Sequence, residues 1–126
     1  MSITIQKKHK ILANMHILPY FCTMFIHNTT YVVPNNDARD FVVWVHQVLL
    51  PRAAAADCGM GGKLMRILSH KEEDTECFSV QLEAPSSAHL HRWHIGPGRI
   101  MADELQKLFD GRIVGFGTLM EEITAD

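Results

Sequence analysis

Residues 75–84 read TECFSVQLEA, and their side chains alternate between two kinds along the segment. Successive side chains of a β-strand point to opposite faces of its sheet, so this alternation predicts a strand. One predicted face consists of Glu76, Phe78, Val80 and Leu82, and the other consists of Cys77, Ser79, Gln81 and Glu83. A largely apolar face opposite a polar one predicts a sheet that is covered on one side only.

Three further strands are predicted around this segment. Residues 63–70 (KLMRILSH) precede it and are separated from it by the polar turn at residues 71–74. Residues 23–33 (TMFIHNTTYVV) are rich in β-branched and aromatic side chains, which favours a first strand. Residues 113–123 follow a helix-ending Asp-Gly pair and form the predicted last strand.

Two helical segments separate these strands. The first carries a single apolar stripe at helical spacing, made of Ala38, Phe41, Val42, Val45, Val48 and Leu49. Pro51 is expected to kink or end this helix near Leu50, and the four alanines Ala53 to Ala56 can form one more turn. The second begins after Pro85, is interrupted by glycine and proline at residues 96–98, and resumes to Phe109.

The resulting order, βαββαβ, predicts a ferredoxin-like α+β sandwich. Right-handed crossovers in each βαβ half place both helices on one face of an antiparallel sheet. Phe78, Val80 and Leu82 are then expected to face the helices. Their expected helical neighbours are Phe41, Val45 and Leu105.

Composition narrows the classes of function. The chain has 126 residues, a length typical of one domain, and a net charge of −2, which indicates neither nucleic-acid nor membrane binding. Cys22, Cys58 and Cys77 form no CxxC pair, so neither a disulfide framework nor a thiolate metal site is predicted. Free thiols are typical of the cytoplasm, and no cofactor is implied.

Residues 1–23 are interpreted as an extension outside the domain, which then spans residues 24–126. Three lysines precede an apolar run at residues 11–22, as in a secretory signal. Asn14, His16 and Pro19 interrupt that run, however, and it is too short to cross a bilayer.

Several framework segments together resemble one small bacterial family, known as domain of unknown function 4286. They are FIHNTTYVV (25–33), KLMRIL (63–68), FSVQLEAP (78–85), LQKLFDGRIVGFGTLMEEI (105–123) and the first helix with Trp44 and Pro51. The similarity covers residues 24–123 and implies a start near Met24. The family carries no assigned activity, so no catalytic residue is implied. Its members often have His-Ile-Pro where this chain has Leu49-Leu50-Pro51.

The segment His89-Leu90-His91-Arg92-Trp93-His94 is similar to the HxHxDH zinc motif of metallo-β-lactamases. Trp93 replaces the aspartate of that motif. On a helix, His91 and His94 share a face, whereas His89 points about 140° away from His94. We therefore predict no metal site at these histidines.

Two classes of function remain open. The first is a non-catalytic homodimer, paired through its open sheet face, that binds a small molecule. Its predicted ligand-binding residues are Asn28, Thr30, Ser79, Gln81 and His94. The second is a cofactor-free enzyme of the antibiotic-biosynthesis-monooxygenase type, which shares the element order. A cavity walled by helices and sheet, with a buried histidine of shifted pKa, would favour the enzyme.

Overall fold

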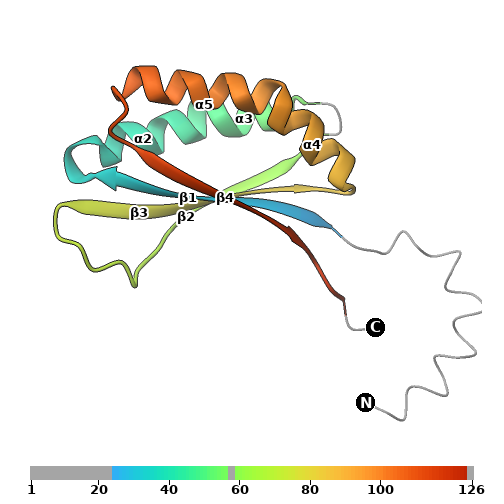
Figure 1. Cartoon of the computed structure of the whole chain (residues 1–126), viewed down its shortest axis with the longest axis horizontal. Coiled ribbons are helices and arrows are strands. Elements are labelled where there is room, and N and C mark those ends of the chain that lie inside the picture. The colour runs from blue at the N-terminus through green and yellow to red at the C-terminus, as the bar shows by residue number, and fades with distance from the viewer. Residues whose placement is uncertain (1–23, 57–58, 125–126) are drawn as a thin grey trace, which may run out of the picture.

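Four strands form one antiparallel sheet in the order β2-β3-β1-β4 (Figure 1). The computed structural model describes residues 24–56 and 59–124, so the predicted extension at residues 1–23 lies outside the described residues. The strand bounds are Phe25–Pro34 for β1, Gly61–Arg66 for β2, Thr75–Ala84 for β3 and Val114–Glu121 for β4. The predicted ferredoxin-like α+β fold is confirmed.

The first helical segment runs through the position where proline was expected to kink or end it. A short turn at Asn35–Asp37 leads into α2 (Ala38–Trp44), a wider π-helical turn (Val45–Leu49) and α3 (Leu50–Ala54). Pro51 has no N–H to donate, and its ring crowds the preceding turn of an α-helix. The wider turn directly before α3 gives the ring room, so the segment continues for one more turn.

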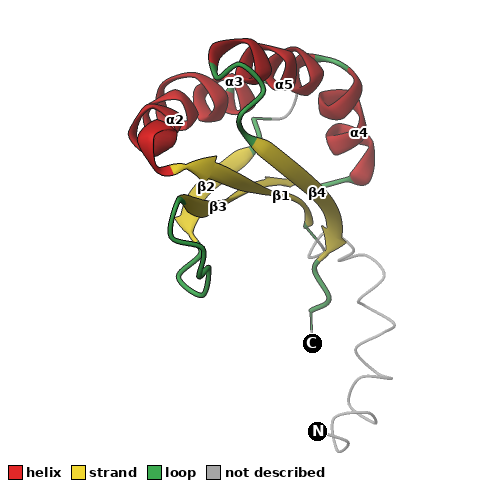
Figure 2. Cartoon of the chain, turned by 60° about the vertical axis from the view of Figure 1, so that its left-hand side comes forward, coloured by secondary structure: helices red, strands yellow, loops and turns green. Residues whose placement is uncertain are grey.

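The second helical segment is divided as predicted, into α4 (Ser87–Ile95) and α5 (Pro97–Leu108). Ser86 caps α4, because its hydroxyl accepts a hydrogen bond from the backbone N–H of His89 at 3.3 Å. Gly96 lies between the two helices. Figure 2 shows all the helices on one side of the sheet.

The hydrophobic core lies between the sheet and the helices. Phe78, Val80 and Leu82 are buried in it, and the Phe78 ring lies 5.3 Å from that of Phe41. Val45 and Leu105 belong to the same buried cluster. The predicted inward face of β3 and its helical neighbours are therefore confirmed.

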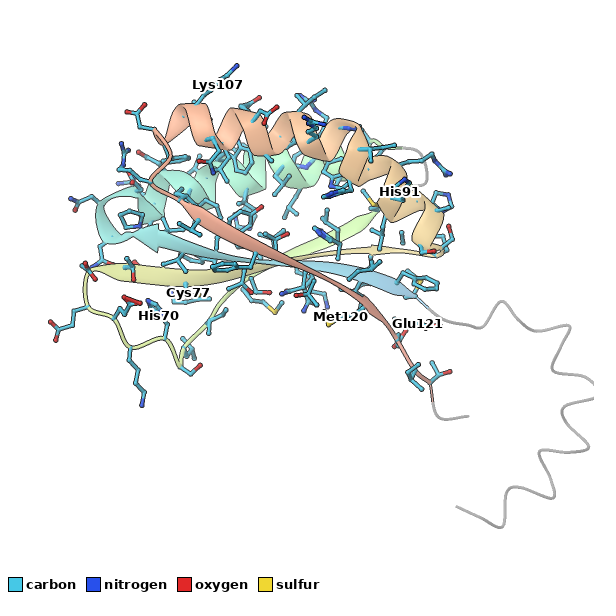
Figure 3. All side chains as sticks on the ribbon, viewed as in Figure 1. His70, Cys77, His91, Lys107, Met120 and Glu121 are labelled. Atoms are coloured by element: carbon cyan, nitrogen blue, oxygen red, sulfur yellow. The ribbon has the colours of Figure 1, made fainter. Side chains whose placement is uncertain are left out.

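The opposite face of the sheet carries no helix in the described part of the chain (Figure 2). Asn28 pairs with Gln81 and Thr30 with Ser79 in the register of β1 and β3. Figure 3 shows Met120 of β4 on this side of the sheet, whereas Lys107 points outward from α5. Within residues 24–56 and 59–124, no helix is long and apolar enough to span a membrane.

Candidate ligand-binding site

The inner face of β1 brings polar rings under the helices. Strand alternation places His27, Thr29 and Tyr31 on the same side as the fully buried Val33. The neighbouring β4 residues at Thr29 and Tyr31 are Gly117 and Gly115. Because these glycines have no side chain, they leave space between the edge strand β4 and the helices that cover the sheet.

Adding a side-chain carbon to either glycine would disturb a ring of β1. A Cβ atom at Gly117 would lie 2.9 Å from Nε2 of His27, and one at Gly115 would lie 3.1 Å from the ring of Tyr31. Real Cβ contacts are rarely this short. The two glycines therefore permit the present positions of the His27 and Tyr31 rings.

A cavity of about 330 Å³ occupies the space between these strands and the helices. Its apolar walls include Leu49, Val80, Leu82, Met101 and Leu105, together with Trp44 and Trp93. The sequence has two tryptophans, and both line this cavity. The polar lining includes His27, Tyr31, His94, Asp103 and Gln106. An apolar cavity with a few polar groups is typical of small-molecule sites.

The two tryptophans are fixed by contacts with α5. Nε1 of Trp44 donates a hydrogen bond to Oε1 of Glu104 at 3.2 Å, which joins α2 to α5. A Cβ atom at Gly98 would lie 2.5 Å from Nε1 of Trp93. The chain can therefore restart as α5 beside Trp93 only because residue 98 is a glycine. Both indole rings are thus held as walls of the cavity.

A second hollow of about 390 Å³ shares His27, His94 and Gly117 with the first. It is also lined by Ser87, Leu90, His91 and Leu119. The rings of His27 and His94 lie with their centroids 6.2 Å apart and their planes tilted by 57°. This pair of histidines therefore borders both spaces.

Burial controls the protonation of both β1 rings. The pKa of His27 is lowered, chiefly because burial disfavours the charged ring and secondly because of repulsion from His94. Burial raises the pKa of Tyr31, an effect that a hydrogen bond with the Thr29 side chain partly offsets. At neutral pH, His27 is thus a neutral imidazole and Tyr31 a neutral phenol.

The structure does not bring the five predicted ligand-binding residues together. Asn28, Thr30, Ser79 and Gln81 lie on the open sheet face, whereas His94 belongs to α4 on the opposite side. The open-face side chains also bond to one another. The Ser79 hydroxyl donates to Oδ1 of Asn28, and Nδ2 of Asn28 donates to the Thr30 hydroxyl at 3.3 Å.

The sequence alone does not single out His27 and Tyr31, although it contains two signals for them. The alternation in FIHNTTYVV places both in phase with Val33, a strongly apolar residue. The GFG triplet at residues 115–117 removes two side chains from the last strand. Without the pairing of β1 with β4, the two signals could not be connected.

The histidine-rich segment contributes to the cavity border. His89 is turned toward the helix start, where its Nδ1 lies 2.7 Å from the Ser86 hydroxyl. His91 and His94 both line the second hollow, as their predicted shared face requires. Among residues 24–56 and 59–124, no three histidine, cysteine or acidic side chains are grouped so that they could hold a metal ion.

The fold and cavity define a ferredoxin-like α+β domain with space for a ligand between its two layers. Residues 24–123 match the family described as domain of unknown function DUF4286, and the chain belongs to that family. Comparison with curated proteins gives no match.

Two solved structures have a fold similar to that of this chain. A Bacillus cereus protein described as an antibiotic biosynthesis monooxygenase is 10% identical, with a TM-score of 0.53. The similarity covers 83% of this chain and 98% of that one. The de novo designed protein Foldit4 is 9% identical, with a TM-score of 0.51 over 82% of this chain and 100% of that one. At these identities, the likeness concerns the fold alone.

Proposed function

We propose that this protein binds a small, largely apolar organic molecule in the cavity between the sheet and helices α4 and α5. The observation that carries the proposal is a space of about 330 Å³ inside the two-layer fold, walled by both tryptophans. That volume lies within the range of small-ligand sites, about 300–1,000 Å³. The ring of His27 supplies a polar group at its border.

A titration with 4-fluorophenol, followed by two-dimensional amide NMR, tests this site. Binding in the cavity should shift both indole N–H signals and the amide signals of Gly98, Gly115 and Gly117. The side-chain amides of Asn28 and Gln81 on the open face serve as internal controls and should stay in place. Shifts confined to those two amides, or no shifts with either 4-fluorophenol or fluorobenzene, would contradict the proposed site.

We also propose that the open sheet face pairs with a second copy of the chain. Its edge strands expose Met65, Val114, Phe116 and Met120 around the bonded polar group of Asn28, Thr30 and Ser79. The charges of Lys63 and Glu83 at this face lie 3.9 Å apart and offset each other. Two copies can therefore face each other without strong repulsion between like charges.

The size of this face suits an interface at the small end of the specific range. The four strands together are roughly 19 Å wide, and their lengths of 6 to 10 residues cover roughly 20–33 Å, so two faces present about 1,000 Å² in projection. Light scattering at micromolar concentration should give twice the chain mass of 14.3 kDa. A wild-type mass of one chain would contradict the pairing.

Matched variants locate the contact surface. Phe116 is 58% exposed on β4, whereas Ile100 is 59% exposed on α5. Phe116→Glu should yield monomers because it places two like charges in the proposed interface. Ile100→Glu should leave the dimer intact. If the Phe116→Glu variant still had the mass of two chains, another surface would have to make the contact.

A cofactor-free enzyme of the antibiotic-biosynthesis-monooxygenase type is the second candidate. The observation that favours it is the half-buried His27, whose pKa is lowered beside the cavity. Incubation of 4-fluorophenol with the protein in air separates the two candidates. A new fluorine NMR signal that grows with protein concentration would favour the enzyme, and an unchanged probe would favour binding alone.

A further inference from the structure

The His27 ring is a hydrogen-bonding group at the border of the proposed site, between the two spaces. Its ring interacts with that of His94, at a centroid separation of 6.2 Å, and no described residue forms a hydrogen bond with it. Among the described residues, every fully buried side-chain nitrogen or oxygen has a hydrogen-bond partner. Because the ring nitrogens of His27 have none there, they are not fully buried. The ring is therefore open to a molecule in either adjoining space.

The walls around His27 restrict what such a molecule can be. The lining of the first cavity is predominantly apolar, and Asp103, the carboxylate in it, is exposed to solvent. A charged ligand would therefore lose its hydration without gaining a buried ionic partner. The phenol of Tyr31 also favours an uncharged ligand, because its raised pKa keeps it un-ionised. An uncharged ligand suits these surroundings.

We propose that the ligand is an uncharged, flat or compact apolar molecule with a phenol-type or enol-type hydroxyl group, which donates its hydrogen bond to His27. This inference rests on the proposed function and specifies its ligand class. A neutral imidazole has one nitrogen that accepts a hydrogen bond, and a weakly acidic hydroxyl is a strong donor. The aromatic walls at Trp44 and Trp93 suit a flat ring.

The protonation of His27 gives the inference a pH dependence with a definite sign. Because the pKa of His27 is lowered from 6.5, the ring stays neutral at and above that pH and accepts the hydroxyl proton. Below the lowered pKa, the ring is protonated and can no longer accept. As long as the ligand hydroxyl is un-ionised, the preference for it should therefore be lost only when the pH falls below the pKa of His27.

Other titratable groups near His27 must be separated from it. His91 and His94 face it from α4, Asp103 lines the cavity from α5, and Tyr31 lies on its own strand. Glu121 lies further along the same side of β4 as Leu119. None of these residues changes in a His27→Phe variant, so that variant isolates the contribution of His27.

Two probes that differ only in a hydroxyl group test the inference. Fluorine NMR should show that 4-fluorophenol binds about tenfold more tightly than fluorobenzene at about pH 8. At a pH below the lowered pKa of His27, where its ring proton signals show that it is protonated, the two affinities should become similar. His27→Phe replaces the ring by one without nitrogen and should remove the preference at both pH values. His46→Phe, an exposed histidine on the first helical segment, should keep it.

The possible outcomes distinguish this inference from the proposed function. Equal affinities of the two probes in the wild type would overturn the ligand class and leave the cavity as a binding site. A preference that survives His27→Phe would assign the acceptor to another group and also overturn the inference. Binding of neither probe would overturn the proposed function itself.

Discussion

Val45→Asp is expected to abolish the folded state. Val45 is 0% exposed in the core between the first helical segment and the sheet. An unpaired carboxylate there loses its hydration at a cost of several kcal/mol, whereas a domain of this size is stable by only about 5–15 kcal/mol. Circular dichroism should show no cooperative thermal transition for this variant.

Val43→Asp provides the matched control, because Val43 lies two residues earlier and is 43% exposed. The same substitution there leaves the charge in water and should change the melting temperature by only a few degrees. If both variants melted together near the wild-type temperature, the placement of Val45 in the core would be wrong.

Gly117→Ala is expected to weaken ligand binding while the fold is kept. The new Cβ atom would lie 2.9 Å from Nε2 of His27. The atom that it meets is the end of a side chain, so the imidazole ring can rotate away while the strand stays in place. Rotation displaces the imidazole from its present position at the border of the two spaces, so its nitrogen no longer meets the ligand in the same place. We expect at least about a tenfold loss of affinity for 4-fluorophenol.

Gly61→Ala is the control for this prediction, since a Cβ atom there meets nothing within 4 Å. Both variants should unfold cooperatively, because alanine replaces glycine within a strand in each case. Affinities are compared by fluorine NMR. A Gly117→Ala protein that binds as tightly as Gly61→Ala would show that the position of His27 does not determine the site.

Local patterns in the sequence predict most of the fold. Residues 75–84 were predicted as a strand from alternation alone, and β3 has those same bounds. The helix stripe likewise predicts the burial of Phe41 and Val45. These features are local because a strand or helix in contact with one core must repeat its apolar residues at a fixed period.

Local patterns leave open whether the first helical segment ends at Pro51 or continues into a turn of the alanines after it. Proline disfavours an α-helix at that position by its local chemistry. Whether the preceding turn widens or the helix ends depends on how much the continued helix buries. Here Ala53, in the turn that follows Pro51, is fully buried in the core.

The candidate site was less predictable because it depends on contacts between distant segments. The sequence favours Asn28, Thr30, Ser79 and Gln81 as exposed polar groups, yet three of them bond to one another. In the sequence, His27 is only one residue of a predicted strand that is rich in β-branched and aromatic side chains. Its importance emerges from the facing glycines of β4 and from the position of His94 on α4.

The most direct test of the ligand cavity is the position of a bound heavy atom. Crystals of the protein soaked with 4-bromophenol can be measured at the bromine absorption edge, where anomalous scattering locates the bromine. We expect one bromine peak inside the cavity, between Trp93, Met101 and the inner face of β1, with the hydroxyl directed at His27. A bromine peak on the open sheet face beside Ser79 and Gln81, with the cavity empty, would contradict it.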